Sequence, residues 1–463
     1  MTRNQRPLAA LAAVAAALTL TTSATAAPAA EEPPSPLALN WTKSDPVTVA
    51  AGVTRTTWTE RNLDNRTAPR VLQVVEIDPA LSALTLGSTV GRTDAAPEAL
   101  PDQLATVSSV AARHPYAGTN GGLFQLEPAA AGTTERNAVH TSATATDGVL
   151  HSASCWTGGQ GSNGAVIQYG IPYITKLLTD LKLTGPTGES IRLDDVNRSP
   201  GRVAHCARDA EDTRVTVSPS VYTDPDEIVL FTDDYGTPTP KPGIDPTVPA
   251  TSDPGFEVVL DANGVVTDAH PGRGGTTVPA GGRVLQGIGS GADWLRTRLV
   301  RDDRASVEQK LRDVTLGRDI PLDASVDVVS SFHRLLTSGS IPAELPNSCS
   351  DTTKPGKDPA ILICTDSRTS LATNIKGNPV LVTLTAKDGE DGDYLRTFAA
   401  LLDSKELALV DALNLDGGGS TTLMAGTQLL TPPTDTVGGV KVHRKVADAV
   451  YAGVGGYGMY AKP

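Results

Sequence analysis

Three consecutive glycines between a carboxylate and a run of hydroxyls most restrict how this chain can fold; residues 413–430 read LNLDGGGSTTLMAGTQLL. The apolar residues before Asp416 predict a strand that carries this carboxylate at its end. Glycines at 417–419 have no Cβ, so the backbone can take positive φ and its N–H groups can approach a ligand closely. Consecutive N–H groups in such a turn form an anion-binding concavity, to which Ser420 and Thr421 would add hydroxyl donors. The stretch predicts either an anion site beside an acid or an ordinary tight turn capped by Asp416.

The N-terminal residues predict export. Arg3 and Arg6 precede an apolar run of about 13 residues at 8–20, which is too short to cross a bilayer, and small residues at 24–26 form a cleavage site. We therefore expect residues 1–26 to be a cleaved signal peptide and the protein to be secreted. The alternative is a short apolar helix that the mature protein keeps. Residues 27–46 are rich in Pro, Ala and Glu without periodicity and predict a disordered spacer.

Composition argues against two kinds of partner and indicates disulfides. A formal net charge of −13 disfavours a nucleic-acid partner, and no later run reaches 18 apolar residues, so no membrane span is expected. Four cysteines in an exported chain favour disulfides. We expect the pairs Cys155–Cys206 and Cys349–Cys364, because the second pair closes a short loop. A zinc site is the alternative, although the sequence contains no CxxC pair.

The pattern along the chain predicts an α/β fold of the α+β type. Short apolar runs such as 71–79 read as strands, 97–115 has helical spacing, and Asn263-Gly264 is a strong hairpin signal. We expect one domain over 47–463, in which helices pack on a mixed, largely antiparallel sheet. A β-rich segment with hairpins is expected as an insertion at about 194–320.

Two further segments place polar side chains beside bare backbone or at a strand end. Asn120 precedes two glycines in NGGLF at 120–124, and Arg368 follows an apolar run in DSRT at 366–369. Either segment alone would be an ordinary turn or a solvated arginine. Beside a second glycine-rich turn, however, a guanidinium could clamp a phosphodiester through two parallel hydrogen bonds.

Taken together, NGGLF at 120–124, RTSLA at 368–372 and NLDGGGSTT at 414–422 resemble the phosphodiester glycosidase family. The family carries N-G-G-F-F, R-T-A-(I/V)-G and N-L-D-G-G-G-S-(S/T)-T in the same order. The chain departs from the family pattern at three places: Ser370-Leu371-Ala372 follows Arg-Thr, Asp388-Gly389-Glu390 replaces an Asp-Gly-Arg, and Asp448-Ala449 replaces an Asn-Ala.

The resemblance implies hydrolysis of a sugar-1-phosphodiester with an N-acetylglucosamine-like sugar, releasing free sugar and a phosphomonoester. Envelope or exopolysaccharide glycans would supply such a substrate. Asp416 is the candidate general acid/base or water-orienting carboxylate, Arg368 would hold the phosphate, and Asn120 would fix sugar hydroxyls or the phosphate. The residues expected to bind substrate are Gly121, Gly122, Phe124, Thr369, Gly417, Gly418, Gly419, Ser420 and Thr421.

Several assignments stay open at this point. Ordinary glycosidases use two carboxylates, and the second could be Glu127, Asp366 or Asp388. No cofactor is expected, although a calcium ion could sit in the acidic loop at 388–393. The alternative functions are a non-catalytic glycan- or phosphate-binding wall protein and a nuclease or plain phosphodiesterase. A serine hydrolase is disfavoured because the chain contains no G-x-S-x-G segment.

Overall fold

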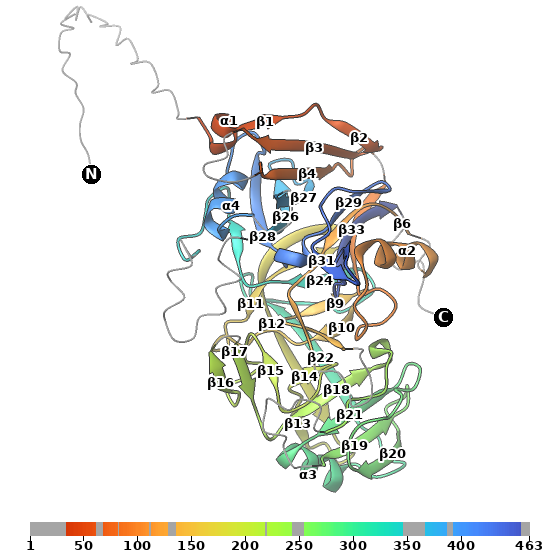
Figure 1. The fold of residues 1–463 in the computed structure, drawn as a ribbon. Coiled ribbons are helices and arrows are strands. Elements are labelled where there is room, and N and C mark those ends of the chain that lie inside the picture. The colour runs from red at the N-terminus through yellow and green to blue at the C-terminus, as the bar shows by residue number, and fades with distance from the viewer. Residues whose placement is uncertain are drawn as a thin grey trace, which may run out of the picture. The chain divides into compact units, whose positions relative to one another are not determined.

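The computed structural model describes residues 34–61, 68–81, 83–110, 113–127, 136–217, 220–242, 254–345, 366–386 and 392–454 (Figure 1). The chain divides into two units, Met1–Pro34 and Ser35–Pro463, and the helices and strands of the described residues belong to the second. The predicted signal peptide and the predicted pair Cys349–Cys364 lie outside the described residues.

The first sheet has the strand order β1-β3-β4-β27-β26-β28-β25, with β2 also paired to β3, and its pairs are antiparallel. Pairing of β4 with β27 joins strands from the N-terminal part of the chain to strands from its last quarter, and Figure 1 shows these as red strands beside blue ones. The strands are β1 (Trp41–Lys43), β2 (Val47–Ala50), β3 (Val53–Glu60), β4 (Val71–Ile77), β25 (Arg334–Leu336), β26 (Arg368–Asn374), β27 (Pro379–Thr385) and β28 (Leu409–Asn414).

Alternation along these strands buries both faces of the sheet. Ala372 and Val382 point to a core that contains Leu395 and Phe398 of helix α4 (Leu395–Leu402). Neighbouring residues such as Leu371 belong to a different core, shared with the second sheet. Because successive side chains of a strand face opposite ways, β26 packs against a core on each face. This packing fixes the position of Arg368, the first residue of the strand.

The second sheet has the order β30-β29-β6-β33-β5 and carries the NGG segment at the end of β6. Its strands are β5 (Leu84–Thr89), β6 (His114–Asn120), β29 (Leu423–Ala425), β30 (Gln428–Leu429) and β33 (Ala449–Val454). Helix α2 (Leu100–Val110) covers it, with Leu100 and Leu104 in one core with Ala449 and Tyr451. Leu423 of β29 pairs with Thr119 of β6, so the chain segment after the triple glycine lies beside the NGG segment.

The middle of the chain forms further sheets. One has the order β10-β9-β24-β11-β12-β22-β23 with β13 on β12, another β14-β18-β21-β19-β20, and a third β15-β17-β16. Residues of the first two share a core with helix α3 (Gly289–Arg298). Their strands are β9 (Thr144–Thr146), β10 (Val149–Ser152), β11 (Ser162–Gln168), β12 (Ile171–Thr184), β13 (Ser190–Arg192), β14 (Asp195–Val196), β15 (Val203–Ala204), β16 (Thr213–Val217), β17 (Ser220–Thr223), β18 (Ile228–Thr232), β19 (Phe256–Leu260), β20 (Val266–Pro271), β21 (Arg283–Gly287), β22 (Ser306–Asp313), β23 (Arg318–Ile320) and β24 (Val326–Ser330).

Short elements complete the described chain. Two hairpins, β7 (Phe124–Leu126) with β8 (Ala138–His140) and β31 (Asp435–Val437) with β32 (Val440–Val442), stand apart from the larger sheets. Helix α1 (Pro36–Asn40) and strand β1 lie inside the segment that was expected to be a disordered spacer. They are ordered because Leu37 and Trp41 bury their side chains in the core beside α4. Two 3₁₀ turns span η1 (Asp233–Tyr235) and η4 (Gly418–Ser420).

The fold prediction is confirmed for the antiparallel sheets and for the Asn263-Gly264 hairpin, where Gly264 joins β19 to β20 with a φ of 77°. The predicted α/β class overestimated the helix content, because the described chain is mainly β. The apolar run at 71–79 forms β4, as predicted, and strands far outnumber helices among the described residues. The segment at about 194–320 is β-rich, but β22 pairs with β12, so its limits as an insertion stay a prediction.

Candidate active site

A cavity of about 540 Å³ lies where the loops after β6, β15 and β28 meet the start of β26. We divide its lining into two parts. The charged wall comprises Asp366, Arg368, Asp416, Gly417, Gly418, Gly419, Ser420 and Arg444, and the apolar wall comprises Leu123, Phe124, Leu126 and His205. Of the predicted site, Asp416, Arg368, Phe124 and residues 417–420 line the cavity, together with Arg444 and His205, which were not predicted to have a role.

Asp416 follows β28 at the edge of the cavity. Its backbone N–H donates to the Gly121 carbonyl at 3.0 Å, and its Oδ1 accepts from the Gly417 N–H at 2.9 Å. Burial raises the pKa of this carboxyl to about 6, although hydrogen bonds from Ser420 and Gly417 act in the opposite direction. At neutral pH it is therefore mainly ionised but close enough to its pKa to accept and release a proton.

The triple-glycine turn is not a row of amides aimed at the cavity. The Gly417 N–H is bound by Asp416, that of Gly418 by the Ser367 carbonyl at 2.9 Å, and those of Ser420 and Thr421 by carbonyls of the turn itself. The expected cradle of consecutive free N–H groups is thus not formed, because the tight 3₁₀ turn uses these donors internally. The glycines instead allow charged side chains to approach the backbone.

Close approaches at two glycines explain why side chains are absent there. A Cβ at Gly418, whose φ is 57°, would lie 2.8 Å from Oδ2 of Asp366. A Cβ at Gly419 would lie 2.2 Å from the guanidinium carbon of Arg444. The Asp366 carboxylate and the Arg444 guanidinium therefore pack directly against the backbone of the turn.

Replacing Gly419 by alanine should lower kcat/KM about 10–100-fold, because the new methyl group displaces the Arg444 guanidinium, and displacements near 1 Å can cost about 10²-fold. Steady-state kinetics would measure the loss. In an Arg444→Ala background, the same change should cost little more, since the clash is then gone. Additive losses in the double variant would contradict this account.

Arg368 begins β26 and is almost fully buried. Its Nε donates to the Asp393 carbonyl at 3.0 Å. Burial lowers the pKa of the guanidinium to about 10, against the attraction of Asp366 and Asp393, so the side chain stays charged at neutral pH. A buried guanidinium at a cavity wall can bind an anionic ligand through charge-assisted hydrogen bonds.

Arg444 is the second guanidinium of the charged wall, and the sequence analysis missed it. It makes a three-contact ion pair with Asp435 at 2.9–3.2 Å, and Thr434 donates to the Gly419 carbonyl at 2.8 Å, so the base of the β31–β32 hairpin is fixed to the turn. Burial alone would lower the pKa of Arg444, but the carboxylates of Asp435, Asp416 and Asp366 outweigh it. The pKa is therefore higher than that of an ordinary arginine. Its signal in the sequence was the basic run His443-Arg444-Lys445.

Asn120 joins the three sequence motifs and is fully buried. Its Nδ2 donates to the Asp416 carbonyl at 2.7 Å, and its Oδ1 accepts from the Thr369 hydroxyl at 2.9 Å and the Thr422 N–H at 3.1 Å. The three segments therefore meet in space, although Asn120 itself is not among the residues that line the cavity. Since its amide is occupied by these contacts, we interpret Asn120 and Thr369 as positioning residues that hold Asp416.

The glycines of the NGG segment also serve packing. A Cβ at Gly121 would lie 2.4 Å from the Asp448 carboxyl, and one at Gly122 would lie 2.5 Å from the Ser330 carbonyl. Thr421 is likewise buried. These residues were expected to contact substrate; the structure instead gives them a role in shaping the turn beneath the cavity.

Of the carboxylates proposed as a partner for Asp416, Glu127 and Asp366 are among the described residues, and of these two Asp366 lines the cavity. Its Oδ1 accepts from the Ser367 N–H at 2.9 Å, and it lies against the same turn as Asp416. Glu127 is buried elsewhere and accepts hydrogen bonds from the N–H and hydroxyl of Ser199 at 2.9 and 3.2 Å. Asp388 lies outside the described residues, as does most of the acidic loop at 388–393.

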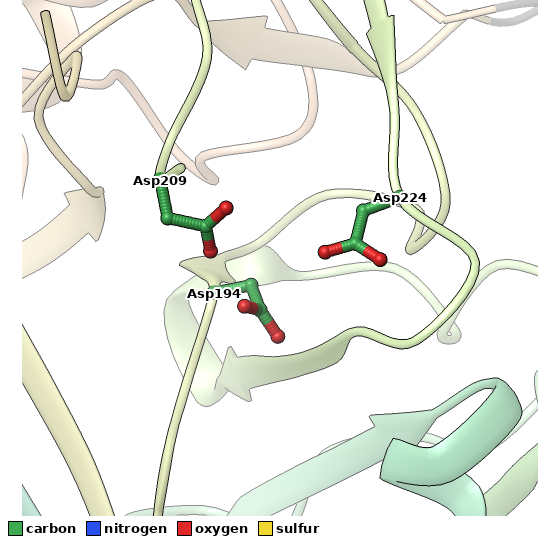
Figure 2. Close-up of side chains that lie close together, drawn as sticks. All are labelled: Asp194, Asp209 and Asp224. Carbon is green, nitrogen blue, oxygen red and sulfur yellow. The ribbon is translucent and has the colours of Figure 1, made fainter. Parts of the chain in front are cut away.

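Three buried carboxylates away from the cavity have the oxygen ligands that a hard cation prefers. Asp194, Asp209 and Asp224 each offer an oxygen within 4.8 Å of the others, and Figure 2 shows them converging from separate loops. Asp209 also pairs with Arg192 at 2.8 Å. Burial and the neighbouring charge of Glu227 raise the pKa of Asp194 to about 9, and its hydrogen bond with Asp209 contributes to this rise. A proton shared between Asp194 and Asp209 is therefore an alternative to a cation at this cluster.

Replacing Asp194 by asparagine should raise the free energy of unfolding at pH 7 by up to about 4 kcal/mol. The folded protein keeps a proton that the unfolded chain, with an ordinary pKa of 3.8, releases; this costs about 1.4 kcal/mol per pH unit. Stability of the unmodified protein from this source falls as pH rises from about 4 to about 9. Denaturant unfolding at pH 4.5–8 should show the two proteins converging at acid pH; parallel curves would contradict the prediction.

Comparison with known proteins bears on the charged wall. Residues 255–452 match a family model described as phosphodiester glycosidase. The family resemblance predicted from the motifs is confirmed. The matched residues include Asp366, Arg368, Asp416 and Arg444, whereas the NGG segment and His205 precede the phosphodiester glycosidase match. No curated protein sequence gives a significant match.

Solved structures support the fold. A protein of Burkholderia pseudomallei K96243, provisionally described as exported, is 20% identical, covers 92% of this chain and 98% of its own, and has a TM-score of 0.73. A hypothetical protein from Synechocystis is 18% identical over 87% of this chain and 62% of its own, with a TM-score of 0.56. The catalytic domain of zebrafish N-acetylglucosamine-1-phosphodiester α-N-acetylglucosaminidase, auto-inhibited by pro-peptide, is 12% identical over 89% of this chain and 88% of its own, but its TM-score of 0.38 supports no argument.

Proposed function

We propose that the protein hydrolyses the glycosidic bond of a sugar-1-phosphodiester. The observation that carries this proposal is the charged wall, which places two carboxylates, Asp366 and Asp416, beside two guanidiniums, Arg368 and Arg444. Carboxylates serve proton transfer at a glycosidic carbon, and guanidiniums suit a phosphodiester. The family match over 255–452 supports phosphodiester glycosidase activity in general.

The chemistry follows from the charges. Asp416, ionised at neutral pH, takes a proton from a water molecule whose oxygen attacks the anomeric carbon. The bond from that carbon to the phosphate oxygen breaks, and the electron pair leaves with the phosphomonoester. The departing group goes from one negative charge toward two, and Arg368 and Arg444 stabilise this added charge more than the single charge of the bound substrate. Such differential stabilisation lowers the barrier.

The finer assignments are part of the same proposal. The sugar is an N-acetylglucosamine-like residue of envelope or exopolysaccharide glycans, and the protein acts outside the cell. The disulfide between Cys155 and Cys206, which was predicted and is present, suits an oxidising compartment. Among the described residues no helix is both long enough and apolar enough to cross a membrane.

A product assay tests the proposal. The purified protein is incubated with a panel of sugar-1-phosphodiesters, and free sugar and sugar phosphate are quantified separately, with and without chelator. We expect free sugar and a phosphomonoester. Sugar phosphate as the product would identify a plain phosphodiesterase, and saturable binding without either product would identify the non-catalytic glycan-binding alternative; both results overturn the proposed reaction.

A further inference from the structure

His205 reaches the cavity on a loop whose backbone is unusually constrained. It is half-buried and has a φ of 73°, in the left-handed region that is uncommon outside glycine, although Asn, Asp and His adopt it more often than other residues. The next residue, Cys206, is tied to Cys155 by the disulfide, and the His205 N–H donates to the Ser220 carbonyl at 2.7 Å. Backbone conformations of this kind persist only when the surrounding structure enforces them, and they gather at ligand sites.

Hydrogen bonds join this loop to the other half of the apolar wall. The Leu123 carbonyl accepts from the Thr141 N–H at 2.9 Å, and the Thr141 and His140 carbonyls accept from the buried guanidinium of Arg208. Residues 123–126, 140–141 and 205–208 are therefore one structural block. The His205 ring also packs near Phe332, with ring centroids 6.5 Å apart. The His205 side chain lines the same cavity as Phe124 and Leu126.

The two walls differ in the chemistry that they can recognise. The charged wall carries the guanidiniums and suits phosphate. The apolar wall offers an aromatic ring, two leucines and one imidazole, whose ring nitrogens are polar. A pyranose ring matches this wall, since it has apolar C–H surfaces together with hydroxyls that both donate and accept. Mostly apolar surface with a few polar groups is the usual composition of small-molecule sites.

We propose that His205 is a substrate-contacting residue that binds the sugar, with Phe124 and Leu126 forming the surface on which the ring packs. This proposal rests on the proposed function and adds an orientation: the sugar lies on the apolar wall, and the phosphate lies on the charged wall. His205 acts in binding, so its removal raises KM more than it lowers kcat. The loop between β15 and β16 is thereby assigned to sugar specificity.

Replacement of His205 by asparagine tests the proposal, because Asn tolerates positive φ and removes only the imidazole. Calorimetric titration compares two ligands, N-acetylglucosamine 1-phosphate and inorganic phosphate. We expect H205N to weaken the sugar phosphate about tenfold and to leave inorganic phosphate unchanged. The matched control is His114→Asn, which alters an exposed histidine at the start of β6 and should change neither affinity. Thermal unfolding confirms that both variants fold.

Further measurements separate this inference from the proposed reaction. The imidazole signal of His205, identified as the one missing from the H205N spectrum among seven histidines, should shift as the sugar phosphate is added. If this shift and the selective loss of affinity occur but no phosphodiester is hydrolysed, the proposed reaction fails and the sugar site stands. Equal affinity of both proteins for the sugar phosphate, or no binding of it by the unmodified protein, overturns the inference whether or not hydrolysis is seen.

Discussion

Replacing Asp416 by asparagine should lower kcat about 10²–10⁴-fold and leave the affinity for a sugar phosphate within about threefold. Asparagine keeps an oxygen that can accept the Gly417 N–H, now bonded to Asp416 Oδ1 at 2.9 Å, so the turn should survive. Only the proton acceptor is lost. Single-turnover kinetics and calorimetry separate the two effects, and a variant that retains full turnover would remove Asp416 from the mechanism.

The pH dependence gives the same assignment an independent readout. Burial raises the pKa of Asp416 to about 6, and a base must be ionised to act. We therefore expect kcat/KM to rise about tenfold per pH unit below pH 6 and to level off above it. This rise of kcat/KM with pH, the acid limb of the profile, should be absent from the Asp416→Asn variant.

Asp366→Asn is the matched comparison, because Asp366 lines the same wall and touches the same glycine turn. This variant should keep the limb near pH 6. If instead the limb disappears in Asp366→Asn and persists in Asp416→Asn, the base is Asp366.

Replacing Arg368 by glutamine should lower kcat/KM about 10²–10³-fold without lowering the free energy of unfolding. Burial lowers the pKa of this guanidinium to about 10 despite Asp366 and Asp393, which means that the folded protein disfavours the charge. A neutral side chain of similar polarity removes that cost, while the phosphate loses a charge-assisted partner. Functional sites often carry residues that oppose stability in this way.

Two comparisons sharpen this prediction. Arg368→Lys keeps the charge but not the planar fork, so its activity should fall between those of the glutamine variant and the unmodified protein. Denaturant unfolding gives the stability of each. A large loss of stability in Arg368→Gln, in proportion to its loss of activity, would show that Arg368 is structural and that the phosphate is held elsewhere.

Much of the site could be predicted from short patterns because its backbone requirements are local. Asp416 follows a strand and precedes a turn, and these features depend on residues within a few positions. The contact between the three motifs, by contrast, joins residues about 250–300 positions apart. The structure accounts for it through Asn120, which contacts Asp416, Thr369 and Thr422.

The roles of the glycines could not be read in the same way. Gly418 and Gly419 suggested an amide cradle, yet what excludes a Cβ there is Asp366, about 50 residues earlier, and Arg444, on the far side of a hairpin. His205 and Arg444 were missed for a similar reason: no local motif marks His205, and the basic run around Arg444 does not show that its side chain lines a cavity. Each gains its position from distant contacts, the Cys155–Cys206 disulfide in one case and the β31–β32 hairpin in the other.

By itself, the sequence determined the strand that ends at Asp416 and the resemblance of its motifs to the phosphodiester glycosidase family, since both depend on short patterns of residue types. Only the tertiary structure decided that the described chain is mainly β, that Asp366 lines the same cavity as Asp416, and that Arg444 and His205 line it too. The physical reason is that a binding cavity is made by side chains whose loops meet through long-range strand pairing and close packing, and neither is encoded in any single stretch of the chain.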